Sequence, residues 1–334
     1  MGKIVTRHNQ PFRDGDSPFM VGFLLFPQFA MLSFSSVIEP LRIANRMSGK
    51  SLYCWHLMSL DDQGLEASNG LPFMPTLAMA DWHELDALIL VAGLGTNLIA
   101  DERLFQWLRK VGRSRRLLGS TSTGSFLLAK AGLLDRKHCT IHWENQASLQ
   151  EEYPEIMVSN ELFEIDQGIM TCSGGTAGLD MMLSLIERQH GGELAKQIAE
   201  QCIHPNIRSA HEKQRMSHEA RLGVHNSTLI AAIKVMESHI EDPLSCESIA
   251  MLVDVSHRQM QRLFKQHFGV TPANYYLNFR LEHGDRLLRY TSMPIIDIAT
   301  ATGFSSTSHF SKCYRKFFGI SPKERRKTGL NRTA

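Results

Sequence analysis

Residues 298–322 of this 334-residue chain have the sequence IATATGFSSTSHFSKCYRKFFGISP, and residues 249–272 have the sequence IAMLVDVSHRQMQRLFKQHFGVTP. Each stretch begins with a short apolar segment and passes through a turn. It then continues into a segment whose apolar residues recur with the spacing of one helical stripe. Both stretches end in Phe-Gly, a β-branched residue, a hydroxyl residue and Pro. This repetition predicts two helix-turn-helix units in an all-α C-terminal domain that binds DNA.

The two turns differ at one position. In the second unit, Gly303 can adopt the positive φ that a tight turn requires, and Phe304 is expected to enter the core. Ser305 or Ser306 is the expected N-cap of the helix that follows. In the first unit, Asp254 occupies the place of Gly303. Because Asp tolerates the left-handed conformation less well than Gly, this turn is predicted to be strained or differently shaped.

Each second helix is predicted to have an apolar inner face and a polar outer face. The inner faces carry Met260, Leu263, Phe264, His267 and Phe268, and then Phe310, Cys313, Tyr314 and Phe317. The outer faces, which we expect to contact DNA, carry His257, Arg258, Gln261, Arg262 and Lys265, and then Ser308, Ser311, Lys312 and Arg315. Arginine favours guanine and glutamine favours adenine, so Arg258, Gln261 and Arg262 are the better candidates for base recognition.

The charge of the chain is unevenly distributed. From residue 226 to the end there are 15 lysines and arginines against 9 acidic residues, whereas the remainder has 21 against 25. A C-terminal part with net charge +6 beside a body with net charge −4 favours double-stranded DNA as a partner. The alternative, two ordinary surface helices with solvated charges, fits a single unit better than a repeated one. Residues 275–290 are predicted to form one helix that holds both units rigidly.

Composition disfavours several other classes of protein. The six cysteines show no Cys-x-x-Cys pair and no metal-ligand spacing, so we interpret them as reduced thiols and expect no metal or other cofactor. No apolar run approaches the roughly 18 residues of a membrane span, and the first residues lack the apolar core of a signal peptide. We therefore expect a cytoplasmic protein without a membrane partner.

The acidic body alternates apolar runs with helical segments. Residues 19–26 and 85–92 are continuous apolar runs, as expected of strands buried on both faces, and residues 115–120 are a third, shorter strand. Residues 162–172 are predicted to form a hairpin, and a long helix follows to about residue 189. This pattern predicts an α/β domain with a doubly wound, mostly parallel sheet of the flavodoxin-like type.

Ligands of such sheets bind at the carboxyl ends of the strands, where two segments of this chain are expected to meet. Ser122 lies in a sharp strand-to-helix turn, and the N–H groups of Thr123 and Gly124 after it suit a carboxylate. The loop that contains Gly93 and Gly95 is expected to add further N–H donors for an anion. Together these residues predict a small-molecule site.

Three further side chains belong to this candidate site. Glu39 is expected to hydrogen-bond Ser122 or to face a cationic ligand group, or else to cap a helix. Trp143, next to His142, is expected to offer a cation–π face, with Phe34 as a second ring, or else to be a core residue. A ligand that carries both a carboxylate and an ammonium group would satisfy all of these groups.

The motifs of both halves resemble known families. Residues from about 227 to 327 resemble the DNA-binding domain of AraC/XylS-type bacterial transcription regulators, and residues 303–311 and 318–322 carry the resemblance. The body resembles the PfpI-type, class I glutamine amidotransferase-like domain at residues 122–126, 131–135 and 140–143. Joined in one chain, the two halves resemble a GlxA-family transcription regulator.

This resemblance implies a ligand-responsive, sequence-specific regulator that activates genes of amine or amino-acid catabolism. Residues 142–145 and 171–176 are most similar to the subgroup that responds to glycine betaine, carnitine or related amines. The implied partners are promoter DNA, a carboxylated amine or amino acid as effector, a second copy of the chain and, for an activator, RNA polymerase.

Enzymes of the PfpI-type superfamily carry a Cys nucleophile at the turn where this chain has Ser122. A serine needs a strong general base, and no Asp or Glu occupies an obvious position to orient His142. Ser120 also interrupts the Gly-x-Ser-x-Gly turn of hydrolases. We therefore expect no catalytic residue and a sensor in place of an enzyme. The alternatives are a DNA-bound hydrolase or amidotransferase that uses Ser122, and an architectural DNA-binding protein whose body only dimerises.

The expected domain organisation has four parts. Residues 1–18 form a flexible arm, 19–202 the ligand-sensing domain, 203–225 a linker and 226–328 the DNA-binding domain. The linker is either a solvated connector or a relay through which a bound effector changes how domains or subunits are disposed.

Overall fold

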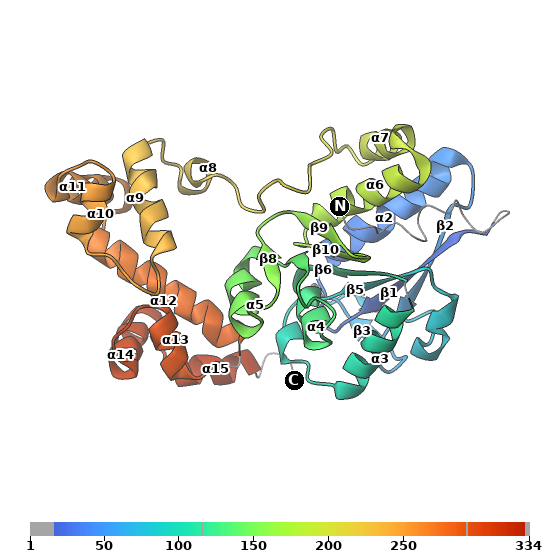
Figure 1. Ribbon diagram of the computed structural model, residues 1–334, viewed down its shortest axis with the longest axis horizontal. Helices are drawn as coiled ribbons and strands as arrows, with labels where there is room; N and C mark the ends of the chain where they lie inside the picture. Colours follow the sequence, from blue (N-terminus) through green and yellow to red (C-terminus); the bar gives the residue numbers. More distant parts are fainter. Residues whose placement is uncertain (1–16, 115, 292, 331–334) are drawn as a thin grey trace. The chain divides into compact units, whose positions relative to one another are not determined.

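The computed structural model describes residues 17–114, 116–291 and 293–330 (Figure 1). The chain divides into two compact units, with the boundary between Gln214 and Arg215, inside the segment expected to be a linker. The arm expected over residues 1–18 lies outside the described residues apart from its last two. None of the described helices is long and apolar enough to cross a membrane.

The first unit is built on a sheet whose described strands follow the order β2-β1-β5-β6-β10-β9. Neighbouring strands run parallel except in the antiparallel hairpin β9–β10. Every residue of β5 and β6 is buried, as in a parallel sheet covered on both faces. The predicted doubly wound, mostly parallel sheet is therefore confirmed. In sheet order the strands are β2 (Tyr53–Met58), β1 (Phe19–Leu25), β5 (Ala87–Val91), β6 (Leu117–Thr121), β10 (Ile169–Cys172) and β9 (Phe163–Asp166).

Helices cover both faces of this sheet (Figure 1). Strand β1 shows how the side chains divide between the two layers. Val21 and Phe23 join the core beneath α2 and α6, whereas Leu24 points the other way and joins the core beneath α3 and α4. The first layer contains α2 (Met31–Ser48), α6 (Ala177–His190) and α7 (Gly192–Gln201), and the second contains α3 (Glu102–Arg113) and α4 (Ser125–Lys130).

The other described elements of the first unit are short. Two of them, η3 and η4, directly follow β6 and β7 and so lie where the sequence predicts a ligand site. The short elements are β3 (Leu65–Glu66), β4 (Pro72–Phe73), β7 (His138–Thr140), β8 (Met157–Ser159), α5 (Gln146–Glu152) and the 3₁₀ helices η1 (Met79–Glu84), η2 (Thr96–Leu98), η3 (Ser122–Gly124) and η4 (Trp143–Asn145).

The second unit is helical and contains the predicted repeat. Helices α10 and α11 form the first helix-turn-helix, and α13 and α14 form the second. Both bounds of α14 lie 50 residues after those of α11, but α13 follows α10 by 49, so the second turn is one residue longer. The helices are α8 (His218–Leu222), α9 (Ser227–Ser238), α10 (Cys246–Leu252), α11 (His257–Phe268), α12 (Pro272–Tyr290), α13 (Ile295–Ala301), α14 (Thr307–Phe318) and α15 (Pro322–Leu330).

The local signals at the turns work as expected, with one refinement. Gly303 has φ +70° and Asp254 has φ +54°, so both occupy the left-handed region and the Asp turn has the same kind of backbone as the Gly turn. Asp254 therefore adopts the left-handed conformation that we predicted to be strained for an aspartate. Ser256 and Ser306 are the N-caps, and each hydroxyl accepts a hydrogen bond from the N–H three residues later.

The inner faces are confirmed except at two equivalent positions. His267 and Phe317 were expected inside, but both are exposed, Phe317 by 40%. The reason is where the neighbouring helix packs. Phe268 stacks on Tyr275 of α12 with ring centroids 4.8 Å apart, so the side of α11 that carries Phe268, and not His267, is covered. The equivalent Phe318 packs against the core of the second helix-turn-helix, which leaves the side that carries Phe317 uncovered.

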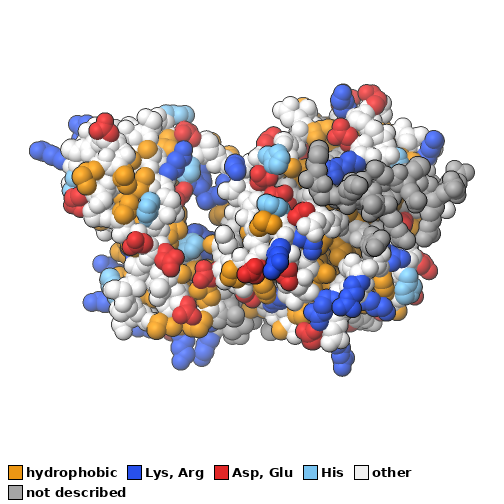
Figure 2. All heavy atoms as spheres, in the orientation of Figure 1, with side chains coloured by type: hydrophobic (Ala, Val, Ile, Leu, Met, Phe, Trp, Pro, Cys, Tyr) orange, Lys and Arg blue, Asp and Glu red, His pale blue; other side chains and the backbone are white. Residues whose placement is uncertain are grey.

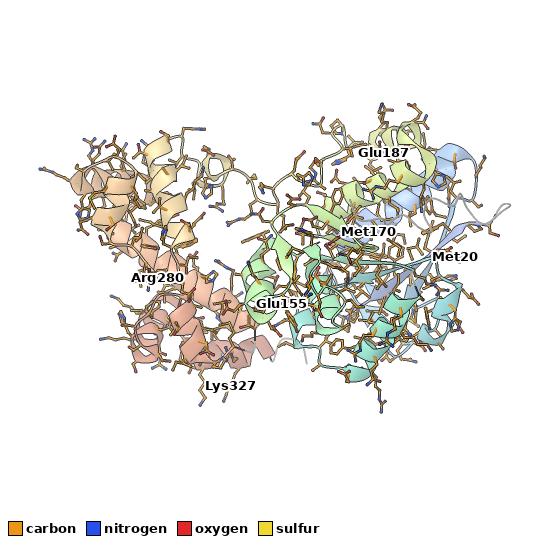
Figure 3. All side chains as sticks on the ribbon, in the orientation of Figure 1. Met20, Glu155, Met170, Glu187, Arg280 and Lys327 are labelled. Atoms are coloured by element: carbon orange, nitrogen blue, oxygen red, sulfur yellow. The ribbon has the colours of Figure 1, made fainter. Side chains whose placement is uncertain are left out.

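Helix α12 holds the two helix-turn-helix units together. Tyr276, near the start of α12, belongs to the core of the first helix-turn-helix. Leu281 and Leu288, further along α12, belong to the core of the second helix-turn-helix. Arg280, which projects from α12 (Figure 3), donates to the carbonyl of Thr302 at 2.7 Å and lies over the ring of Phe304 at 4.6 Å. Because one rigid helix contributes to both cores, the predicted connecting helix is confirmed.

The turn at Gly303 yields a test with a matched control. A Cβ at Gly303 would lie 2.6 Å from both the carbonyl oxygen of Ile240 and a ring carbon of Pro243, whereas a Cβ at Gly319 meets nothing within 4 Å. Both glycines have positive φ, so Gly319→Ala costs only backbone strain, about 1–2 kcal/mol. We expect Gly303→Ala to lower the free energy of unfolding of the C-terminal unit by more than Gly319→Ala in urea titrations. Equal losses would contradict the packing described for this turn.

Candidate functional site

The turn after β6 has the geometry of a nucleophile elbow. Ser122 has φ +55°, an unfavourable value for a residue other than glycine, and is only 8% exposed. Gly124 allows the chain to turn tightly, because a Cβ there would lie 3.0 Å from the Leu90 carbonyl oxygen and from Ser120. The sharp strand-to-helix turn predicted at Ser122 is therefore confirmed.

Hydrogen bonds tie this elbow to the segment after β7. The Ser125 hydroxyl donates to the Thr140 carbonyl at 2.7 Å and lies 3.0 Å from the Ser120 hydroxyl. The His142 N–H donates to the carbonyl of Ser122 at 3.4 Å. The side chain of His142 therefore starts from a backbone that lies against the elbow, as the predicted site requires.

A third segment reaches the elbow that the sequence analysis did not assign to the site. Ser33, in the first turn of α2, accepts a hydrogen bond at its Oγ from the Gly175 N–H at 2.9 Å. A Cβ at Gly174 would lie 2.8 Å from the Cβ of Ser122 and 3.0 Å from the Oγ of Ser33. Ser33, Ser122 and Gly174 are therefore direct neighbours. The signal in the sequence was the pair Gly174-Gly175 immediately after a predicted strand.

The thiol nearest to the elbow is not a nucleophile. Cys172 is fully buried at the end of β10, and burial raises the pKa of its thiol to about 12. Backbone hydrogen bonds from Gly174 and Ser122 lower this pKa but do not offset the burial. The thiol is therefore neutral near pH 7, and the thiolate that attacks in cysteine chemistry is absent.

The loop after β5 braces the elbow, and the Gly93 amide is not free to be the anion donor that we expected. The Gly93 N–H donates to the Thr96 hydroxyl at 3.3 Å, and the next N–H, that of Leu94, donates to the Gln28 carbonyl. The Thr123 hydroxyl donates to the Gly93 carbonyl at 2.6 Å. Gly95, with φ +73°, is the N-cap of η2, and its role as an anion donor stays a prediction. The predicted role of Gly93 as an anion donor is wrong, because loop closure uses its N–H group.

Glu39 does not lie where the sequence predicted. It is in the middle of α2, half-exposed, and forms an ion pair with Arg42 at 2.6 Å. It neither hydrogen-bonds Ser122 nor caps a helix. Ser33, six residues earlier on the same helix, takes the position beside the elbow, because packing of Phe34 and Val37 into the core fixes the rotation of α2.

His142 and Trp143 are half-buried next to each other. Their ring centroids are 5.5 Å apart, and the Nδ1 atom of His142 lies 3.8 Å from the carboxylate of Glu144. Burial lowers the pKa of His142, and Glu144 partly opposes this shift. Phe34 is not a second ring for Trp143, because it is buried among Phe23, Phe29 and Phe73.

No catalytic hydrogen bond connects these groups. Within the described residues, the Ser122 hydroxyl has no hydrogen-bond partner. The described residues also contain no group of three or more His, Cys, Asp or Glu side chains that could hold a metal ion. The elbow thus keeps its backbone shape while its hydroxyl is unengaged.

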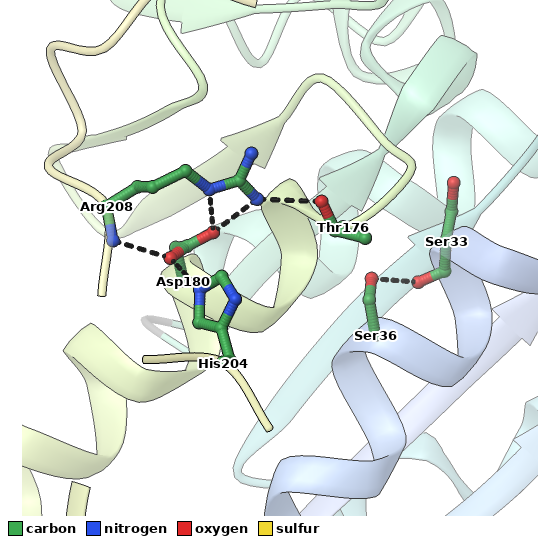
Figure 4. Close-up of polar contacts among 6 residues, drawn as sticks. All are labelled: Ser33, Ser36, Thr176, Asp180, His204 and Arg208. Carbon is green, nitrogen blue, oxygen red and sulfur yellow. Dashed lines mark hydrogen bonds and ion pairs between the residues drawn. The ribbon is translucent and has the colours of Figure 1, made fainter. Parts of the chain in front are cut away.

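Residues 204–214, which we call the strap, run from the start of α6 to the segment after β7 in the first unit. Arg208 donates from its backbone N–H and from its guanidinium to the carboxylate of Asp180, which is fully buried (Figure 4). Arg208 also donates to Thr176 at 2.7 Å, and His204 Nε2 lies 2.8 Å from Asp180. These contacts fix the strap to the first turns of α6, directly after Gly174 and Gly175.

The other end of the strap is fixed beside His142. The Nε2 of Gln214 donates to the Thr140 hydroxyl and to the carbonyls of Ile141 and Glu161, all at 2.9 or 3.0 Å. The strap therefore contacts both segments that flank Ser122. Because the strap ends at the boundary between the two units, it is the last segment of the first unit before the chain enters the helical unit.

The outer faces of α11 and α14 present the predicted side chains to solvent. Arg258, Gln261, Arg262 and Lys265 are exposed on α11, and Ser308, Lys312 and Arg315 are exposed on α14. His257 and Ser311 are half-buried, and His257 lies 3.2 Å from Glu247. Arg315 has Glu324 at 3.9 Å. Both surfaces are positively charged helix faces of the kind that enter a major groove.

A helix-turn-helix pair joined to an α/β body defines a DNA-binding protein with an additional α/β domain. The chain matches the DJ-1/PfpI family over residues 21–188 and a helix-turn-helix domain family over residues 249–328. It is 42% identical over 310 residues to the HTH-type transcriptional regulator GbdR of Pseudomonas aeruginosa, covering 93% of this chain and 84% of that protein. It is 35% identical to the regulator GlxA of Rhizobium meliloti, covering 92% and 96%.

This chain therefore belongs to the DNA-binding transcription regulators, GlxA among them, that join a DJ-1/PfpI domain to an AraC-type helix-turn-helix domain. An AraC family transcriptional regulator from Pseudomonas putida has a similar solved structure, with 31% identity and a TM-score of 0.52 over 55% of this chain and 100% of its own. The isonitrile hydratase of Pseudomonas putida is 30% identical over 177 residues, which is 53% of this chain and 74% of that enzyme.

The predicted DNA-binding faces can be tested on each helix separately. We expect Arg262→Ala to weaken binding to a promoter duplex by about 1–3 kcal/mol, roughly 5- to 150-fold, because a base-contacting guanidinium is lost. Lys312→Ala should reduce the slope of log affinity against log salt concentration by about 0.9, the value for one phosphate contact. Fluorescence anisotropy over a range of salt concentrations measures both. Lys234→Ala, on the exposed side of α9, removes a charge elsewhere and should change neither.

Proposed function

We propose that this regulator binds a small effector at the elbow of Ser122 and that the effector controls its DNA binding. The observation that carries the proposal is the strained elbow with φ +55° whose hydroxyl has no hydrogen-bond partner among the described residues. A strained conformation persists only where its surroundings support it, and such strain concentrates at functional sites. The elbow here retains the strain without a thiolate or an engaged base, which favours binding over catalysis.

The proposed effector is a carboxylated amine or an amino acid. The free hydroxyl of Ser122, with the backbone of Thr123 and Gly124 after it, suits a carboxylate oxygen. The half-buried indole of Trp143 offers a face to an ammonium group, an attraction that strengthens as the cation is desolvated. Glu39 takes no part in this revised site, and Ser33 takes its place. Genes of amine or amino-acid catabolism are the proposed targets, with activation as the proposed outcome.

The absence of enzymatic activity is part of this proposal. The partial match to an isonitrile hydratase keeps a DNA-bound enzyme as the second candidate, since a serine at the elbow can act as a nucleophile if a base reaches it. Incubation with ester, amide and isonitrile substrates and with reactive acyl probes distinguishes the two. Turnover that depends on Ser122 would support the enzyme.

The proposed assembly is a homodimer formed through the α/β bodies, which would place two pairs of helix-turn-helix units on a repeated operator. RNA polymerase is the further partner if the protein activates transcription. Promoter DNA is the site of action, which in a bacterial cell means the cytoplasm.

We propose the strap as the route of the effector signal. It is hydrogen-bonded to Thr176 and Asp180 on one side of the elbow and to Thr140 and Ile141 on the other. An effector that changes the spacing of these two segments changes the strap between them. The strap then passes that change to the chain that enters the DNA-binding unit.

The effector site is tested first by a thermal-shift screen of glycine betaine, carnitine and related carboxylated amines, and of amino acids. A ligand at 100 times its Kd stabilises the folded state by about 2.7 kcal/mol, which gives a shift of several degrees. We expect Gly174→Ala to abolish the shift, because the new methyl group would lie against Ser122 and Ser33. Gly175→Ala is the control, since φ is also positive there but nothing lies within 4 Å of its Cβ.

Ser122→Ala should weaken effector binding at least several-fold while DNA binding without effector is unchanged. Isothermal titration calorimetry and anisotropy measure the two properties. An unchanged effector dose curve in Ser122→Ala would place the site elsewhere in the protein.

The strap is tested by Arg208→Lys, which keeps the charge but loses the two-pronged contact with Asp180. We expect this variant to bind the effector with nearly unchanged Kd but to lose most of the effect of the effector on promoter binding. Arg42→Lys, at the exposed ion pair with Glu39, is the matched control and should behave like the natural protein. A normal response in Arg208→Lys would exclude the strap as the route.

A further inference from the structure

Helix α3 of the first unit carries an exposed basic stripe that the effector site does not use. Arg103, Lys110 and Arg113 are exposed, with Gln106 between them. Spaced by three, four and three residues, the four side chains fall on one face of the helix. The opposite face contains Leu104, Phe105, Leu108 and Val111, all buried in the core. The stripe is therefore directed to solvent by the packing of α3 itself.

The acidic residues of α3 do not neutralise this stripe. Asp101 is the N-cap, and its carboxylate accepts hydrogen bonds from the N–H groups of Arg103 and Leu104. Glu102 forms an ion pair with Arg109, which lies off the stripe. Among the described residues, Arg103, Lys110 and Arg113 form no ion pair. Three cations on this face thus have unused capacity for an anionic partner.

A basic stripe is unexpected in the first unit, because this part of the chain is acidic overall. The part of the chain before residue 226 has net charge −4, yet Lys and Arg side chains gather over α3 (Figure 2). Trp82 limits the freedom of one of them, since the Nζ of Lys110 lies 5.9 Å from the centre of its ring, and Arg116 lies over the same ring at 4.8 Å. Restricting Lys110 before binding lowers the side-chain entropy that is lost when a partner binds it.

We propose that α3 is a second DNA-contacting surface, which binds phosphates of the duplex outside the segment that α11 and α14 occupy. The repeating phosphates of a duplex match a row of cations along a helix, and this chain already holds a duplex through its C-terminal unit. Because its proposed partners are phosphates, which carry no sequence information, the contribution of the stripe is affinity and not sequence recognition.

The experiment compares two duplexes with the full-length protein. One duplex contains only the operator segment that the variant without the three α3 cations protects in a footprint, and the other extends it by about two helical turns, roughly 20 base pairs, on each side. The triple variant Arg103→Gln, Lys110→Gln, Arg113→Gln should bind the short duplex as the natural protein does. On the long duplex the slope of log affinity against log salt concentration should fall by about 2 to 3, since each lost phosphate contact removes about 0.9.

A second triple variant controls for the change in net charge. Lys50→Gln, Arg188→Gln and Lys196→Gln remove three exposed cations from the other layer of the same unit. This variant should leave both slopes unchanged. If the two variants alter the long-duplex slope equally, or if neither alters it, the α3 stripe is not a DNA contact. Loss of binding to the short duplex as well would also contradict the proposal, because that segment belongs to α11 and α14.

Discussion

Burial of a parallel sheet on both faces is the constraint on which the first unit depends. The strands β1, β5, β6 and β10 are parallel and therefore end at the same edge of the sheet. Helices cover both faces, so the chain cannot cross either face of the sheet. The chain must therefore leave β6 by an abrupt turn, and Ser122 takes the strained φ that this turn needs. Gly124 and Gly174 are required there because a Cβ at either position would collide with its neighbours. The site is thus a consequence of how the sheet is covered.

The features that the sequence predicted well are those with local causes. Two helix-turn-helix units follow from apolar spacing, Ser306 as an N-cap and Gly303 in a left-handed turn, all of which act within a few residues. The elbow at Ser122 follows from an apolar strand that runs directly into a helix. His267 and Phe317 were misplaced because spacing along one helix does not show where the next helix packs.

The contacts that the sequence could not reveal join segments far apart in the chain. Ser33 and Gly175 are 142 residues apart, and which residue of α2 faces the elbow depends on how Phe34 and Val37 pack, so Glu39 was chosen wrongly. The Gly93 amide was assigned to a ligand because its partner, the Thr96 hydroxyl, is visible only in the folded loop. Arg208 and Asp180 likewise pair across 28 residues without a local signal.

The unequal outer faces of α11 and α14 have a consequence for how such a regulator diverges. Helix α11 offers two arginines and a glutamine, whereas α14 offers two serine hydroxyls, a lysine and one arginine that lies near Glu324. With the predicted contacts, mutations in α11 would shift which promoter is preferred, whereas α14 would mainly contribute contacts to phosphates. Helix α12 holds α11 and α14 in a fixed relative orientation. A duplicated copy of the gene could therefore acquire a new target promoter through changes confined to the 12 residues of α11, without changes in the rest of the protein.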